Sequence, residues 1–176
     1  EDQRLALYQR VCFYGESMLQ AYKKSSHAVA KAMVKDIERH IRSSPASKVV
    51  VSVDSDHVED AVMRVSTNMK VVSGRRKKGR STHTTQKAVE AFQSGNADII
   101  LCSSESLKLG INLQRADVIY SLITSDKSDD VLQTFARVCR MNSAHDAVYY
   151  RWVVCRDTLS ELLYNYHKQV RDERSA

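Results

Sequence analysis

A cluster of basic residues between two glycines is the first feature of the sequence that could do chemistry. The segment SGRRKKGRST, residues 73–82, follows a short apolar run and contains five cations: Arg75, Arg76, Lys77, Lys78 and Arg80. Its spacing is one residue away from the phosphate-binding loop G-x-x-x-x-G-K-[ST], with arginine in the place of the lysine. The residue types leave three alternatives: a nucleotide cradle, a loop that meets a polyanion, and a solvated surface loop.

The nucleotide cradle is the weakest of these alternatives. A cradle presents backbone N–H groups to phosphates, and four large cations between the glycines would crowd that close approach. Neither Asp98 nor Asp117 stands at the end of a strand where a magnesium ligand belongs, because both precede apolar runs. Clustered cations instead release counterions when they bind nucleic acid. We therefore expect the segment to contact backbone phosphates, with plain solvated surface as the alternative.

Two arginines three residues apart form a second candidate site. Arg137 and Arg140 lie in QTFARVCRMNS, and they share one face if this segment is helical. A guanidinium has a fixed charge and forked donors, which suit the charge that develops on a transferring phosphoryl group. Spacing alone favours two solvated helix arginines, so the surrounding sequence has to decide between these alternatives.

The overall composition is that of one soluble globular domain with one basic loop. Apolar residues make up 43% and charged residues 27% of the 176 residues, and no run approaches the length of a membrane span. The net charge is +6, and the basic segment supplies most of it. Four scattered cysteines without a C-x-x-C pair predict reduced thiols in an intracellular reducing compartment, and the histidines show no metal spacing.

Strands and helices are expected to alternate along the chain. Short apolar runs predict strands at 48–53, 69–72, 97–102, 118–123 and 147–154. Helical periodicity predicts helices at 4–22, 27–41, 58–65, 84–92, 129–139 and 158–170. Most strands are apolar on both faces, which is typical of a mainly parallel sheet covered by helices on both sides. Ligands on such sheets bind at the carboxyl ends of the strands.

Three segments, in this order, resemble the second RecA-like domain of superfamily 2 helicases and translocases. KVVVSVDS (48–55) resembles the first strand of that domain, and ILCSSESLKLGINLQRADVIY (100–120) resembles its motif V. QTFARVCRMNS (133–143) resembles motif VI, whose pattern is Q-x-x-[GD]-R-x-x-R. The likeness extends over about residues 25–172 and is closest to the SWI/SNF-type and poxvirus-type nucleoside triphosphatase branches. GINLQRAD followed at the right distance by the Q-x-x-x-R-x-x-R spacing is its most specific part.

The resemblance implies a fold and a reaction. The fold is a three-layer RecA-like α/β domain at 25–176, after a helical extension or linker at 1–24 from an upstream domain. The reaction is ATP hydrolysis at a cleft shared with an N-terminal RecA-like domain of the same protein, which binds ATP and holds Mg and is absent from this chain. The resemblance gives Arg137 and Arg140 the role of arginine fingers, Gln133 a role in positioning them, and Gly110 and Asn112 a place on the nucleotide side. The isolated chain is then expected to be inactive.

Nucleic acid is the second implied partner, with DNA favoured over RNA and no membrane partner. The implied contacts are the five cations of the basic segment together with Ser52, Ser55, Ser103, Ser104 and Lys108. For Ser103 and Ser104, helix capping is the alternative. Motif V has Leu107-Lys108 where a small-residue turn is usual, and motif VI has Ala136 where Gly or Asp is usual. The altered motif V turn favours the rival class, a non-catalytic RecA-like binding or assembly module, whereas the intact Arg137/Arg140 pair favours the enzyme. Nucleus or cytoplasm is the expected location, or a virion or viral factory if the protein is viral.

Overall fold

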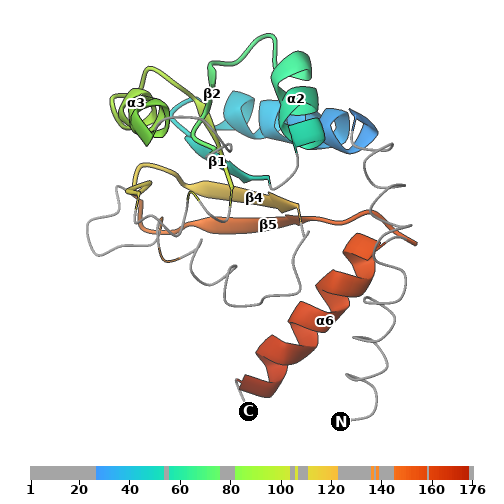
Figure 1. Cartoon of the computed structure of the whole chain (residues 1–176). Helices are drawn as coiled ribbons and strands as arrows, with labels where there is room; N and C mark the ends of the chain where they lie inside the picture. Colours follow the sequence, from blue (N-terminus) through green and yellow to red (C-terminus); the bar gives the residue numbers. More distant parts are fainter. Residues whose placement is uncertain are drawn as a thin grey trace.

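Five parallel strands form the central sheet of the protein, seen here in a computed structural model (Figure 1). The sheet order is β2-β3-β1-β4-β5, with β1 at Val49–Ser52, β2 at Val71–Ser73, β3 at Ile99–Cys102, β4 at Val118–Leu122 and β5 at Tyr149–Val153. The structure describes residues 27–53, 56–75, 82–103, 106, 111–122, 136, 138, 145–157 and 159–174. The five predicted strands are confirmed, and every pairing between them is parallel.

Helices cover both faces of this sheet and complete the three predicted layers. A helix at 27–43 and α2 (Asp56–Val65) pack against one face, and α3 (Thr82–Gln93) packs against the other (Figure 1). The helix at 27–43 ends just before Pro45, which has no N–H to continue the helical hydrogen bonds. The last helix, α6 (Leu159–Arg174), follows β5 and extends away from the sheet.

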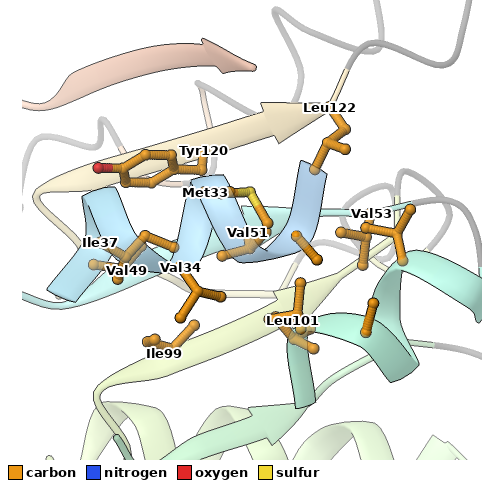
Figure 2. Packing of buried hydrophobic residues seen from close by; sticks show 14 of the residues in the cluster. Met33, Val34, Ile37, Val49, Val51, Val53, Ile99, Leu101, Tyr120 and Leu122 are labelled. Carbon is orange, nitrogen blue, oxygen red and sulfur yellow. The ribbon is translucent and has the colours of Figure 1, made fainter. Parts of the chain in front are cut away.

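Alternating side chains of the strands divide the core into two halves. Val49 and Val51 of β1 face the helix at 27–43, where Met33 and Ile37 are buried against them (Figure 2). Val50 of β1 points to the opposite face and belongs to the cluster around α3. Each fully buried side chain of this size contributes roughly 1.5–3 kcal/mol. Both faces are therefore apolar, as the uninterrupted valine run in the sequence predicts.

The strand order reverses at β1, and this reversal indicates the edge of the sheet where a ligand is expected to bind. The chain lays β2 and β3 on one side of β1 and then crosses to build β4 and β5 on the other side. In doubly wound sheets the crevice beyond the carboxyl ends of the strands at such a reversal binds ligands. In this protein the strands at the reversal are β3, β1 and β4, whose carboxyl ends are at Cys102, Ser52 and Leu122.

Parts of the sequence predictions lie outside the described residues. These are the helical extension at 1–24 and most of the helix expected at 129–139, of which Ala136 and Val138 are described and helical. None of the helices within the described ranges combines the length and apolar character that a membrane crossing requires. Among the described residues, no three His, Cys, Asp or Glu side chains gather into a group that could hold a metal ion.

Candidate nucleic-acid and nucleotide interface

Three serines line the carboxyl edge of the central strands. Ser52 ends β1 and pairs in register with Cys102 of β3 and with Ser121 of β4. Ser103 follows β3 directly, and all three serines are buried. The structure therefore brings Ser52 and Ser103, both predicted from sequence, to the same edge and adds Ser121, which the sequence analysis missed. Its signal was the single polar residue in the fourth strand, VIYSL.

Ser103 caps the helical turn that follows β3. Its Oγ accepts a hydrogen bond from the Ser106 backbone N–H at 3.2 Å and lies 3.0 Å from the Ser106 Oγ. A hydrogen bond from the N–H three residues later to a serine hydroxyl is the N-cap arrangement, which satisfies an otherwise unpaired N–H at the start of a helix. The capping alternative thus describes the Ser103 hydroxyl. The predicted contacts at Ser55, Ser104 and Lys108 lie outside the described residues.

Arg75 differs from its predicted place among the free cations of the basic segment. Its Nη1 lies 2.7 Å from Asp56 Oδ1 and 2.6 Å from Glu59 Oε2, and the side chain is only 8% exposed. The Glu59 carboxylate is also buried and accepts a hydrogen bond from Ser73 Oγ. A phosphate contact by Arg75 would therefore require breaking a buried ion pair, and its role in binding stays a prediction. The other four cations, Arg76, Lys77, Lys78 and Arg80, lie outside the described residues.

The exit of β2 is fixed by close packing as well as by this ion pair. The Gly74 N–H donates to the Leu101 carbonyl at 2.8 Å, which extends the pairing with β3 by one residue. A Cβ on Gly74 would lie 3.2 Å from Ile100 Cδ1, tighter than ordinary packing. Gly74 therefore allows the chain to leave the sheet against its neighbouring strand. The basic segment thus begins from a rigid point at the carboxyl edge.

Asn112, the predicted nucleotide-side residue, lies at the opposite end of the sheet from the serines. Its carbonyl accepts a hydrogen bond from Gln93 Nε2 at 2.7 Å, and Gln93 ends α3 shortly before the amino end of β3. The Asn112 side-chain Oδ1 accepts the Gln114 N–H at 3.1 Å, which closes a local turn. The structure therefore separates Asn112 from the carboxyl-edge serines. Gly110 lies outside the described residues.

Val138, within the segment predicted to hold the arginine fingers, packs on the α3 side of the sheet. Arg137, Arg140 and Gln133 lie outside the described residues, but their neighbours Ala136 and Val138 are helical. Val138 is fully buried in the cluster around α3, whereas Ala136 is exposed. A helix that is buried at one position and exposed two positions earlier has one face on the core and another facing outward. The assignment of both arginines to the cleft stays a prediction.

Two carboxylates brace the amino end of the sheet. Asp117 accepts hydrogen bonds from Ser47 Oγ and from the Lys48 N–H at 2.7–2.8 Å, and Asp98 pairs with Lys48 Nζ at 2.9 Å. Burial by itself raises the pKa of Asp117, but the hydrogen bonds from Ser47 and Lys48 outweigh it and the pKa lies below its ordinary value. The pKa of Asp98 is lowered in the same way, by Lys48 and the Lys70 N–H against burial. Both residues are structural braces at the edge opposite the expected magnesium-ligand position.

We expect these lowered pKa values to make the fold sensitive to acid. A carboxylate whose folded pKa lies below its unfolded value near 3.8 stabilises the protein above that value, and the contribution is lost as pH falls through the folded pKa. The free energy of unfolding should therefore decrease when the pH falls below about 4.

Urea unfolding of wild type and Asp117→Asn at pH 7 and pH 3 measures this decrease, and the variant should lose less stability between the two pH values. Asp60→Asn, at an exposed site on α2, is the matched control and should keep the wild-type difference. Equal pH dependence for Asp117→Asn and wild type would contradict the prediction.

Known proteins resemble this chain in sequence profile and in fold. A protein-family profile described as the helicase conserved C-terminal domain matches residues 32–142, more than half of the chain. The solved structure of the C-terminal part of the Fun30 ATPase domain is similar, with a TM-score of 0.64 and 16% sequence identity over 76% of this chain. This chain spans 44% of that Fun30 chain, and a search of curated proteins finds no match. At this identity the structural likeness supports the fold, and the profile supports the family.

Proposed function

Because the chain belongs to the helicase conserved C-terminal domain family, we propose that it is the second RecA-like domain of an ATP-dependent translocase or helicase that acts on duplex DNA. The profile match at 32–142 carries this proposal. That region contains the strand ends at Ser52 and Ser103, the exit of β2 into the basic segment, and the helical segment around Val138. It thus includes each element to which the proposed chemistry is attached.

In the proposed reaction this chain supplies charge and position. The upstream RecA-like domain binds ATP with its Mg, and the metal neutralises charge on the phosphates. Arg137 and Arg140 direct their guanidinium groups to the γ-phosphate from this side of the cleft, and Gln133 orients them. Fixed, forked donors suit a transition state whose charge spreads over several oxygens. The isolated chain provides neither the phosphate cradle nor the metal carboxylate, so it has no turnover of its own.

The proposed nucleic-acid contacts lie at the carboxyl edge of the sheet. We place them at the segments that follow β1 and β3, near Ser52 and Ser103, because phosphate contacts need hydrogen-bond donors and no reading of the bases. Ser55, Ser104 and Lys108 extend this set in the sequence. Arg76, Lys77, Lys78 and Arg80 supply the long-range attraction, starting from the fixed exit of β2. DNA is favoured over RNA by family likeness alone.

Neutralising the four outer cations should weaken binding to all duplex sequences alike. Each phosphate contact contributes a slope of roughly −0.9 to the log–log dependence of affinity on salt. Changing Arg76, Lys77, Lys78 and Arg80 to Gln should flatten that slope by about two to three units, since not every cation meets a phosphate. Titrations of labelled duplex DNA at several salt concentrations measure this. A variant with the wild-type slope would show that the segment is solvated surface without phosphate contacts.

A non-catalytic binding module is the second candidate function. Two observations favour it: the Ser103 hydroxyl is engaged in a cap, and Leu107-Lys108 replaces the small-residue turn of motif V. The full-length protein distinguishes the two candidates. ATP hydrolysis stimulated by duplex DNA supports the translocase, whereas DNA binding without hydrolysis supports the module, including one that serves a larger viral complex.

A reducing compartment such as nucleus or cytoplasm is the proposed location. Cys102 is fully buried in β3, and burial raises the pKa of its thiol to about 12, which leaves it protonated and unreactive. Burial likewise raises the pKa of the partly buried Cys155 thiol. Both thiols behave as small apolar side chains, which supports a protein made where thiols stay reduced.

A further inference from the structure

The outer face of the helix at 27–43 carries a row of four cations. Lys31, Lys35, Arg39 and Arg42 recur every three or four residues, so they share one stripe. All four are exposed, and Arg39 and Arg42 have side chains 75% and 81% accessible. The opposite stripe of the helix is buried in the core through Met33, Ile37 and their neighbours (Figure 2). The packing of the helix therefore fixes the cations in an outward direction.

The two carboxylates of this helix do not cancel the row. Asp36 turns toward the sheet, where its Oδ2 accepts hydrogen bonds from Tyr120 Oη at 2.7 Å and Arg151 Nη1 at 3.0 Å. These bonds, led by that from Tyr120, lower the pKa of Asp36 despite partial burial. Its second oxygen lies 3.4 Å from Arg39. Such an exposed pair is worth about 0–1 kcal/mol, so Arg39 can exchange it for a phosphate at little cost.

The other three cations of the row are available as well. Arg42 forms only a loose pair along the helix, with 3.7 Å between its Nη2 and Glu38 Oε2. Lys31 and Lys35 form no ion pair with any carboxylate in the part of the chain that the structure describes. An excess of positive charge therefore faces solvent along the length of the helix.

The same face lacks the apolar centre that a protein partner would need. The exposed apolar residues of this helix are the small Ala28 and Ala32. Within the described ranges the exposed large apolar side chains are Met63, on α2, and Tyr149, on β5, and neither lies on this helix. Protein interfaces depend on large apolar or aromatic anchors in desolvated pockets, whereas phosphate contacts need only accessible donors. The chemistry of the face favours a polyanion.

We propose that the outer face of the helix at 27–43 is a second phosphate-binding surface, for the backbone of duplex DNA. Lys31 and Arg42 are eleven residues apart, which is a rise of about 17 Å along a straight helix. One DNA strand advances about 3.4 Å per phosphate, so the row can follow several phosphates of one strand. The proposal rests on the proposed function, because it adds a second contact to the same kind of ligand.

The position of the row supports a joint role with the basic segment. The helix at 27–43 and α2 cover the same face of the sheet, and α2 carries the carboxylates that hold Arg75 (Figure 1). The row and the start of the basic segment are therefore on the same side of the sheet. Two basic features on one side can attract one duplex, which raises affinity without reading sequence.

The test removes the four charges of the row and compares DNA binding with a matched variant. Changing Lys31, Lys35, Arg39 and Arg42 to Gln should flatten the salt slope for duplex DNA by about two to three units and weaken binding about tenfold at low salt. The control changes four exposed cations of other elements to Gln: Arg64, Lys87, Arg156 and Lys168. Because these four are dispersed, the slope should change by less than about one unit. Circular dichroism checks that both variants stay folded.

Each outcome decides between the possibilities. A helix variant with the wild-type slope, beside a basic-segment variant that has lost slope, overturns this inference and leaves the proposed function intact. Equal losses in the helix variant and its control show a general charge effect and overturn it as well. Weaker binding of poly-glutamate by the helix variant, with unchanged DNA binding, indicates an acidic protein partner instead. A wild-type chain that binds no duplex DNA contradicts both this inference and the proposed function.

Discussion

Arg137→Ala and Arg140→Ala in the full-length protein should each lower kcat for ATP hydrolysis by about 10³-fold, with little change in binding of ATP or DNA. An arginine finger acts on charge that forms in the transition state, and supplying one is worth roughly 10³–10⁵ in rate in the phosphoryl-transfer enzymes where it has been measured. An interaction made only in the transition state appears in kcat rather than in ground-state affinity. Steady-state hydrolysis at saturating ATP and duplex DNA measures the rate, and equilibrium titrations measure the two affinities.

The control for this experiment is an arginine of another helix. Arg64→Ala removes an exposed guanidinium from the last turn of α2, and kcat should stay within about twofold of wild type because nothing places it at the cleft. The kcat of Gln133→Ala should lie between those of the finger variants and Arg64→Ala, since the loss of a positioning residue disorders the finger without removing its charge. Unchanged kcat in both finger variants would show that Arg137 and Arg140 are surface residues without a role in catalysis. A loss of DNA binding in parallel with rate would assign the arginines to the nucleic acid instead.

The fold was predictable because its signals are local and consistent. The run VVVS is apolar on both faces, and such a run suits a central strand of a parallel sheet, where β1 lies. In the helix at 27–43, apolar residues every three to four positions predict one buried stripe, and Met33 and Ile37 occupy it. Propensity, periodicity and turn residues agree at these elements, so sequence reasoning located them within a few residues.

The partners of charged residues were not predictable in the same way. Arg75 reads as one member of a run of cations, but its counterions Asp56 and Glu59 stand 16–19 residues earlier and meet it through the packing of α2 against β2. Composition reports the charge of a segment and not the contacts that tertiary structure makes. For the same reason, Asn112 and Ser103 are neighbours in motif V yet lie toward opposite ends of the sheet.

The buried pair at Arg75 should make Glu59 the most sensitive charged residue of the described fold. Glu59→Leu should lower the free energy of unfolding by about 3 kcal/mol, since removal of one partner leaves a buried charge uncompensated. Asp56 still contacts Arg75, but it is 63% exposed and replaces only part of the lost interaction. Arg75 Nε is buried as well and has no hydrogen-bond partner within the described residues, so a contact at Nε does not offset the loss of the one between Nη1 and Glu59. Urea unfolding at pH 7 measures the change.

A double-mutant cycle separates the ion pair from simple packing at this site. Glu59→Leu with Arg75→Met removes both charges and keeps apolar volume, so it should recover most of the lost stability, as replaced buried pairs often do. Asp56→Asn, at the exposed end of the same cluster, should cost less than about 1 kcal/mol. If the double variant is as unstable as Glu59→Leu, the loss comes from packing of α2 and not from an unpaired guanidinium. If Glu59→Leu is itself neutral, Arg75 is held by Asp56 alone, and its guanidinium becomes available to phosphates with the four cations that follow it.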